Sequence, residues 1–114
     1  MKYSGTWHIE EMETWDEDYF NMEVQAYIKV DSKGFGSFQF GLVTGEIHGE
    51  AVQDDGDEKF EFTWEGCDEM DSVSGSGWFK LNDKNSIEGK IKIHQGDSSW
   101  FSAKRAKQRR GKAR

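Results

Sequence analysis

The amino-acid sequence predicts an all-β protein: an antiparallel eight-stranded up-and-down barrel or, as the alternative, a two-sheet β-sandwich. Three observations lead to this prediction. Apolar and polar residues alternate along most of the chain, which is the period of a half-buried strand. Short segments rich in Gly, Asn, Asp and Ser separate the alternating stretches, as hairpin turns do. No segment has the apolar spacing of a long helix.

The alternation is clearest in five segments of the chain. Residues 19–30 place six apolar side chains, from Phe20 to Val30, on one face, so we expect one long strand there. Four further segments each have one apolar face, formed by Phe38, Phe40 and Leu42, by Phe60, Phe62 and Trp64, by Val73, Gly75, Gly77, Phe79 and Leu81, and by Ile87, Gly89, Ile91 and Ile93. Weaker strands are expected at residues 6–12, 46–53 and 98–105.

The predicted turns are all short, and they fall at residues 31–34, 44–45, 54–58, 66–72, 82–86 and 95–97. Short connections make successive strands antiparallel neighbours. A meander of eight strands must either close on itself or leave two edges exposed, and closure gives a barrel. Residues 10–18 have room for one turn of helix before the second strand.

Charge divides the chain into two parts, which we interpret as one β domain over residues 1–105 and a basic tail over residues 106–114. Residues 1–103 hold 8 basic and 22 acidic residues, whereas residues 104–114 hold seven Lys and Arg and no acid. With no apolar anchor, the tail is expected to be disordered. Because an acidic body repels phosphates, we expect nucleic acid to bind, if at all, only through the tail.

The sequence favours a cytoplasmic protein that does not enter a membrane. No apolar run approaches the roughly 18 residues that a membrane helix needs, and the amino terminus lacks the apolar stretch of a signal peptide. The single cysteine, Cys67, has no partner for an internal disulfide, which agrees with a reducing compartment. The oligomeric state cannot be predicted from the sequence.

A Gly5-Thr6-Trp7 sequence in the first strand, followed by an antiparallel meander, resembles the calycin group: the lipocalins, the intracellular fatty-acid-binding proteins and the avidins. The resemblance implies that Trp7 closes one end of the barrel and that Lys104 or Arg105, from the last strand, covers its ring. Residues 13–18 are too short for the helical pair that fatty-acid-binding proteins place there. The alternative for Trp7 is a core tryptophan without a functional role.

Two functions stay open at this point. The first is a small binding protein that holds an apolar or amphipathic ligand inside a calycin-like barrel. Inward glycines leave space for such a ligand, whereas eight large rings on the inward faces argue for a solid core. The residues predicted to contact the ligand, inside the barrel or at its mouth, are Trp7, Trp15, Phe40, Phe62, Trp64, Met70, Gly75 and Gly77.

The second function is an interaction protein with a solid core, whose acidic loops or basic tail bind a macromolecular partner such as another protein. Hairpin parity gathers residues 13–18, 44–45, 67–71 and 95–97 at one end of the barrel. There Trp15 and Met70 lie among acidic residues, which suits a cationic or amphipathic partner.

Catalysis, cofactors and metals have no support in the sequence, so we expect a protein that is not an enzyme. The acidic segment 54–58 lacks the spacing of a calcium-binding loop, and the three histidines fall on strands that are not mutual neighbours. Acidic neighbours make Cys67 a poor nucleophile, and the segment from Ser74 to Gly77 lies within a predicted strand, not at a nucleophile turn.

Overall fold

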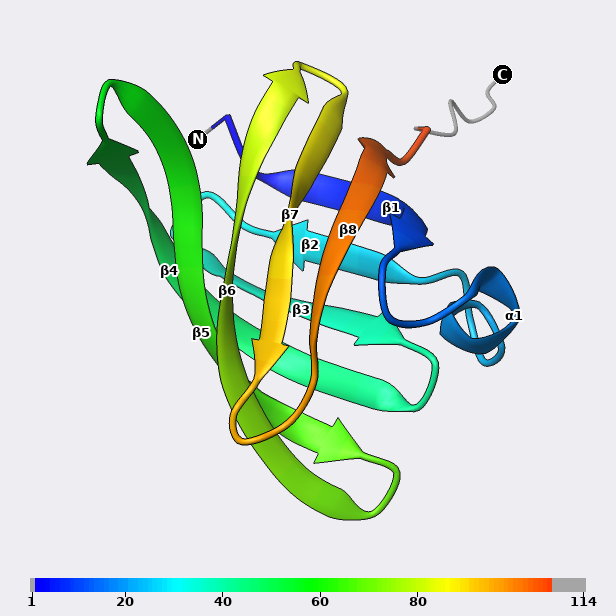
Figure 1. Cartoon of the computed structure of the whole chain (residues 1–114). Coiled ribbons are helices and arrows are strands. Elements are labelled where there is room, and N and C mark those ends of the chain that lie inside the picture. Colours follow the sequence, from blue (N-terminus) through cyan, green and yellow to red (C-terminus); the bar gives the residue numbers. More distant parts are fainter. Residues whose placement is uncertain (1, 108–114) are drawn as a thin grey trace.

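The computed structural model describes residues 2–107, in which eight antiparallel strands close into a barrel in sequence order (Figure 1). Each strand pairs with the next, and the last pairs with the first, so the predicted up-and-down barrel is confirmed and the sandwich alternative is wrong. The strands are β1 (Gly5–Met12), β2 (Tyr27–Val30), β3 (Phe35–Phe40), β4 (Val43–Asp54), β5 (Asp57–Asp68), β6 (Asp71–Asp83), β7 (Ser86–Ile93) and β8 (Ser98–Arg105).

A single short helix, α1 (Glu17–Phe20), joins β1 to β2 among the described residues. Within residues 2–107 no helix is long and apolar enough to cross a membrane. The strands β4, β5 and β6 are the longest, and in Figure 1 β5 and β6 curve strongly along their length. A register shift between Ile9 and Glu11 interrupts the β1–β8 pairing that closes the barrel.

The core follows the predicted alternation. All eight rings expected on the inward faces are buried, and most of them touch another ring of the core. Burying large aromatic side chains removes much apolar area from water, which is the main stabilising contribution in a domain of this size. The eight rings belong to Trp7, Phe20, Phe38, Phe40, Phe60, Phe62, Trp64 and Phe79.

The long strand predicted over residues 19–30 is wrong, because only Tyr27–Val30 forms a strand. The Asp16 side chain caps α1 by accepting from the backbone N–H of Tyr19, which starts a helix where the alternation predicted a strand. Met22 and Val24, placed in the core by the alternation, are 51% and 45% exposed.

The turn predicted at Thr44 and Gly45 is also wrong, because both residues lie within β4. The chain reverses at Gly41, which has a φ of 58°, and at Leu42, so Leu42 does not extend the inward face of β3. Gly45 is needed for packing: a Cβ there would lie 2.6 Å from the ring of Phe38 and 2.8 Å from that of Trp64.

The turn between β5 and β6 is shorter than the predicted 66–72. β5 runs to Asp68 and β6 starts at Asp71, so the turn consists of Glu69, with a φ of 57°, and Met70. Cys67 is consequently an exposed residue of β5 and not a loop residue. Residues 108–114 of the predicted basic tail lie outside the described residues, whereas the backbone N–H of Ala106 donates to the carbonyl of Thr6.

Candidate functional site

One end of the barrel is closed by Trp7 in the way that the resemblance implied. The ring is fully buried, and its indole N–H donates to the carbonyl of Tyr3 at 3.0 Å. The guanidinium carbon of Arg105 lies 4.1 Å from the centroid of the Trp7 ring. Arg105 therefore covers the ring, whereas Nζ of Lys104 lies 3.9 Å from Oε1 of Glu10. Arg105 also donates to the carbonyls of Ser4 and Lys84, which fixes its position.

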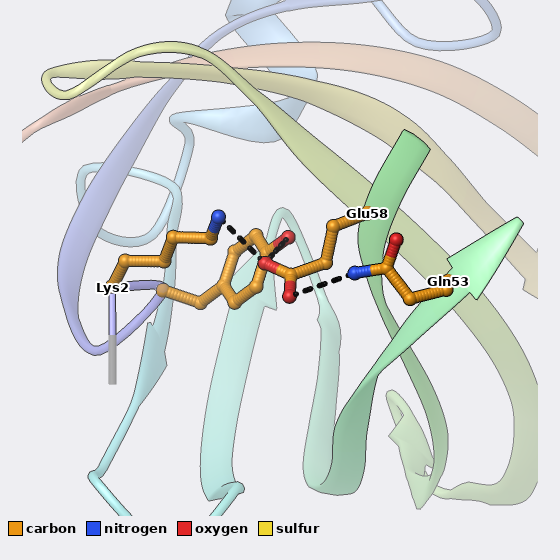
Figure 2. A network of polar contacts seen from close by, with 4 residues as sticks. Lys2, Gln53 and Glu58 are labelled. Carbon is orange, nitrogen blue, oxygen red and sulfur yellow. Dashed lines mark hydrogen bonds and ion pairs between the residues drawn. The ribbon is translucent and has the colours of Figure 1, made fainter. Parts of the chain in front are cut away.

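Tyr3 completes this end, and sequence reasoning missed it. Its ring is buried, with its centroid 5.7 Å from those of Phe60 and Phe79. Its hydroxyl donates to Glu58 at 3.0 Å, and Figure 2 shows the polar network in which Glu58 takes part. The same carboxylate lies 2.7 Å from Nζ of Lys2 and accepts from Gln53 at 3.3 Å.

This network shifts two pKa values in opposite directions. Burial, together with the hydrogen bond to Glu58, raises the pKa of the Tyr3 phenol. The hydrogen bonds from Lys2 and then Tyr3 hold the pKa of the Glu58 carboxyl below its usual value. The network therefore ties the amino-terminal segment to the tip of the β4–β5 hairpin.

The opposite end, where Trp15 was predicted to line an open mouth, is covered by aromatic side chains. The ring centroid of Trp15 lies 4.8 Å from that of Phe40 and 6.3 Å from that of Tyr19. The Tyr19 hydroxyl accepts from the backbone N–H of Leu42 at 3.3 Å, and this contact holds α1 over the β3–β4 turn. Met70, predicted at the same mouth, is 96% exposed and is not part of the core.

The space beside the inward glycines Gly75 and Gly77 is occupied by neighbouring rings and by backbone carbonyls of β7. A Cβ on Gly77 would lie 2.5 Å from Cζ of Phe62, and one on Gly75 would lie 2.9 Å from the indole nitrogen of Trp64. That nitrogen donates to the carbonyl of Lys92 at 3.3 Å. Apart from the exposed Met70, the predicted site residues thus fall into three places: these two ring–glycine pairs in the wall, Trp7 at one end, and Trp15 with Phe40 at the other.

A cleft of about 750 Å³ lies outside the barrel, across β4, β5, β6 and β7. Most of its lining residues occupy the outward positions of these strands, opposite the buried faces of Phe62 and Ile91. The residues that define its chemistry are His48, Glu61, Thr63, Trp78, Lys90 and Lys92.

Two cross-strand rows cross the part of this surface formed by β6, β7 and β8. Lys90 lies between Trp78 and Trp100 in the strand register. In the next row, Lys92 lies between Ser76 and Ser98. Nζ of Lys59 lies 5.2 Å from the centroid of the Trp78 ring, and the same ammonium contacts Asp54 and Glu61.

The outward positions differ sharply in charge between strands. We call the outward side of β4 and β5 the acidic face, since between Thr44 and Cys67 it carries one lysine and six acidic residues, Glu46, Glu50, Asp54, Asp57, Glu61 and Glu65. We call the outward side of β6, β7 and β8 the basic face, since from Ser74 to Lys104 it carries one glutamate and four lysines, Lys80, Lys90, Lys92 and Lys104. The cleft lies on the boundary between the two faces.

Sequence reasoning missed the basic face although the signal was present. The alternation that placed Gly75, Gly77 and Phe79 inside also places Ser74, Trp78 and Lys80 outside. Chemically, a partly exposed indole can stack on a planar group, and the lysine and serine side chains beside it can bind an anion.

Among the described residues, no group of three or more His, Cys, Asp or Glu side chains is arranged to hold a metal ion. No protein-family model, curated protein or solved structure matches this chain.

Proposed function

We propose that this chain is a non-catalytic binding module that takes its ligand in the outer cleft across β4–β7 and not inside the barrel. The observation that supports this most is the contrast between the two spaces. Neighbouring rings and backbone carbonyls occupy the space beside the inward glycines, and aromatic side chains cover both ends. The outer cleft, at about 750 Å³, has the size of a ligand site, for which roughly 300–1,000 Å³ is usual.

The chemistry of the cleft suits a planar, polar ligand. Trp78 offers a flat ring, and the hydroxyls of Thr63 and Ser76 offer hydrogen bonds. The walls differ in charge, with Glu50 and Glu61 on one side and the β7 lysines on the other. Such a site orients a ligand by its charge as well as by its shape.

Two-dimensional NMR with a library of small planar compounds tests this function. Compounds that bind are expected to shift the amide signals of Thr63, Ser76 and Trp78, together with the Trp78 indole signal, in a saturable way. Signals of Ile28 and Phe38, inside the barrel, serve as the reference and are expected to stay in place. Saturable shifts confined to these interior residues would contradict the proposal, as would a library without a single hit at the cleft.

A calycin-like carrier with an apolar ligand inside the barrel is the second candidate. The closed barrel and the stacking of Arg105 on Trp7 favour it, since the calycin resemblance implies both. Native mass spectrometry of the gently purified protein distinguishes the two candidates. A co-purified lipid that displaces the signals of Ile28 and Phe38 supports the carrier, whereas a ligand-free mass together with binding in the outer cleft supports the first proposal. The exposed thiol of Cys67 fits the cytoplasmic location proposed for either.

A further inference from the structure

We propose that the basic face binds single-stranded nucleic acid, with bases stacked on Trp78 and Trp100 and phosphates bound by Lys80, Lys90 and Lys92. This inference rests on the proposed function, because Trp78, Lys90 and Lys92 also line the outer cleft. The ligand of the cleft, together with the neighbouring surface of β8, would then be a single-stranded nucleic acid.

The first argument is charge. The lysines at positions 80, 90 and 92 form no ion pair with any residue in the described range 2–107. Lys90 and Lys92 are exposed, so their ammonium groups are available to an anion. Within residues 1–103, which hold 8 basic and 22 acidic residues, a face with a local excess of lysine marks where a polyanion meets the least repulsion. The inference therefore departs from the expectation that nucleic acid binds only through the tail.

The second argument is the arrangement of the aromatic residues. Trp78 and Trp100 flank Lys90 in one cross-strand row, and Trp100 is 38% exposed. Neighbouring strands are spaced by about 4.8 Å, so the two tryptophans lie about 10 Å apart along the row. Surfaces that bind single strands combine this kind of aromatic platform with nearby lysines, because unpaired bases expose faces on which a ring can stack.

The third argument is the neighbouring row, in which Lys92 lies between Ser76 and Ser98. An ammonium flanked by two hydroxyl side chains supplies several donors to one phosphate or sugar. A duplex keeps its bases stacked and leaves the tryptophans without partners, and a sulfated polysaccharide has no aromatic ring to offer them. The combination of both rows therefore favours a single strand.

The acidic groups next to this face limit the affinity and the direction of the strand. Glu88 lies opposite Lys80 and Ser102 on the face itself, and Asp97 lies in the β7–β8 turn. Glu61 forms an ion pair with Lys59, with 3.4 Å between its Oε2 and Nζ of the lysine. Glu50 lies on the wall of the cleft opposite the β7 lysines. We expect these carboxylates to repel phosphates from β4 and β5 and to hold the strand over β6–β8.

Fluorescence anisotropy with labelled twelve-nucleotide oligo-dT and oligo-U, titrated with the full chain, tests the inference. Three phosphate contacts predict a slope of about −2 in log K against log salt concentration. Lys90→Gln with Lys92→Gln is expected to weaken binding about tenfold at low salt and to reduce the slope to about −0.7. The matched control, Lys29→Gln with Lys33→Gln, removes the same charge from β2 and its turn and is expected to change the affinity less than twofold.

A second pair of variants tests the stacking. Trp78→Ala is expected to weaken binding about tenfold or more, and Trp78→Phe is expected to restore most of it, because a ring remains. Circular dichroism melting curves identify any variant that has unfolded. If Trp78→Ala has unfolded, the affinities of Trp78→Phe and Trp100→Ala test the stacking in its place.

Several outcomes would overturn the inference. Oligonucleotide binding that is unaffected by the Lys90 and Lys92 changes would place the contact elsewhere, for example on the basic segment after residue 107. Equal affinity for a duplex, or tight binding of heparin that is insensitive to Trp78→Ala, would exclude recognition of unpaired bases. If planar compounds bind the cleft and no oligonucleotide does, this inference fails while the proposed binding function stands.

Discussion

The acidic face and the basic face are adjacent parts of one sheet, and they are built on the same alternation of inward and outward residues. On the acidic face, glutamates stand directly opposite each other across β4 and β5, as Glu46 with Glu65 and Glu50 with Glu61. Like charges in such a pair are destabilising. On the basic face, no lysine stands opposite another, because the register places tryptophans opposite Lys90 and serines opposite Lys92.

Inward and outward positions are therefore under different constraints: the core restricts the residues at inward positions but not the charge at outward positions. Both faces cover the same aromatic core, which requires apolar residues or glycine at most of the inward positions. The outward positions are free of that requirement, so their charge carries information about partners and not about the fold. The boundary between the faces is where the cleft lies, and there both kinds of charge are within reach of one ligand.

The largest effect on the free energy of unfolding is expected from a substitution in the aromatic core that both faces cover. Phe62→Ala removes a buried ring from beneath the cleft and is expected to lower the free energy of unfolding by about 3–5 kcal/mol. Phe35→Ala is the matched control, because this ring is 52% exposed on the outer surface and its loss should change stability by about 0.5 kcal/mol. Urea denaturation monitored by circular dichroism measures both. Equal losses would show that the inward and outward positions are not energetically distinct.

The inward pattern made most of the fold predictable. Strict alternation in β5, β6 and β7 gave their buried faces, and Gly-Thr-Trp in β1 located the residue that closes one end. The segment from Tyr19 to Ala26 was mispredicted because a local cap on α1 and the need to cover the barrel end outweigh a pattern with period two.

The site was less predictable, since its residues meet through strand register and not through proximity in the sequence. Trp78, Lys90 and Trp100 come from three strands and become neighbours only when the pairing is known. Tyr3 was missed for a similar reason, because its partner Glu58 is 55 residues away. The sequence has no motif for this site, so only the alternation of inward and outward residues could have placed these lysines on the outer surface.

A smaller effect on stability is expected from the network around Glu58, which contacts Lys2, Tyr3 and Gln53. The pKa of Glu58 is lowered in the folded state, so its contribution to stability is present above pH 4.5 and is lost as the pH falls through the folded value. The pKa of Tyr3 is raised above 10.0, so its contribution is complete below pH 10.0 and is lost as the pH rises through the folded value.

Tyr3→Phe tests this network by removing the hydroxyl and keeping the ring. It is expected to lower the free energy of unfolding by about 1 kcal/mol at neutral pH, which is typical of one intramolecular hydrogen bond. Glu58→Gln should flatten the loss of stability between pH 5 and pH 3, relative to the unmodified chain. Urea denaturation at a series of pH values measures both, and an acid limb as steep in Glu58→Gln as in the parent would exclude Glu58 as its source.

The smallest effect is expected from the charges that distinguish the two faces. Glu46→Lys converts the opposed pair with Glu65 into a pair of opposite charge and is expected to raise the free energy of unfolding by about 0.5 kcal/mol. Lys90→Glu is the matched change on the basic face, where the residues opposite are tryptophans, so no gain is expected. Because exposed charges are screened, the Glu46→Lys gain should shrink in 1 M salt. A gain in Glu46→Lys matched by a loss of similar size in Lys90→Glu would mean that net charge, and not the cross-strand register, governs the stability of this surface.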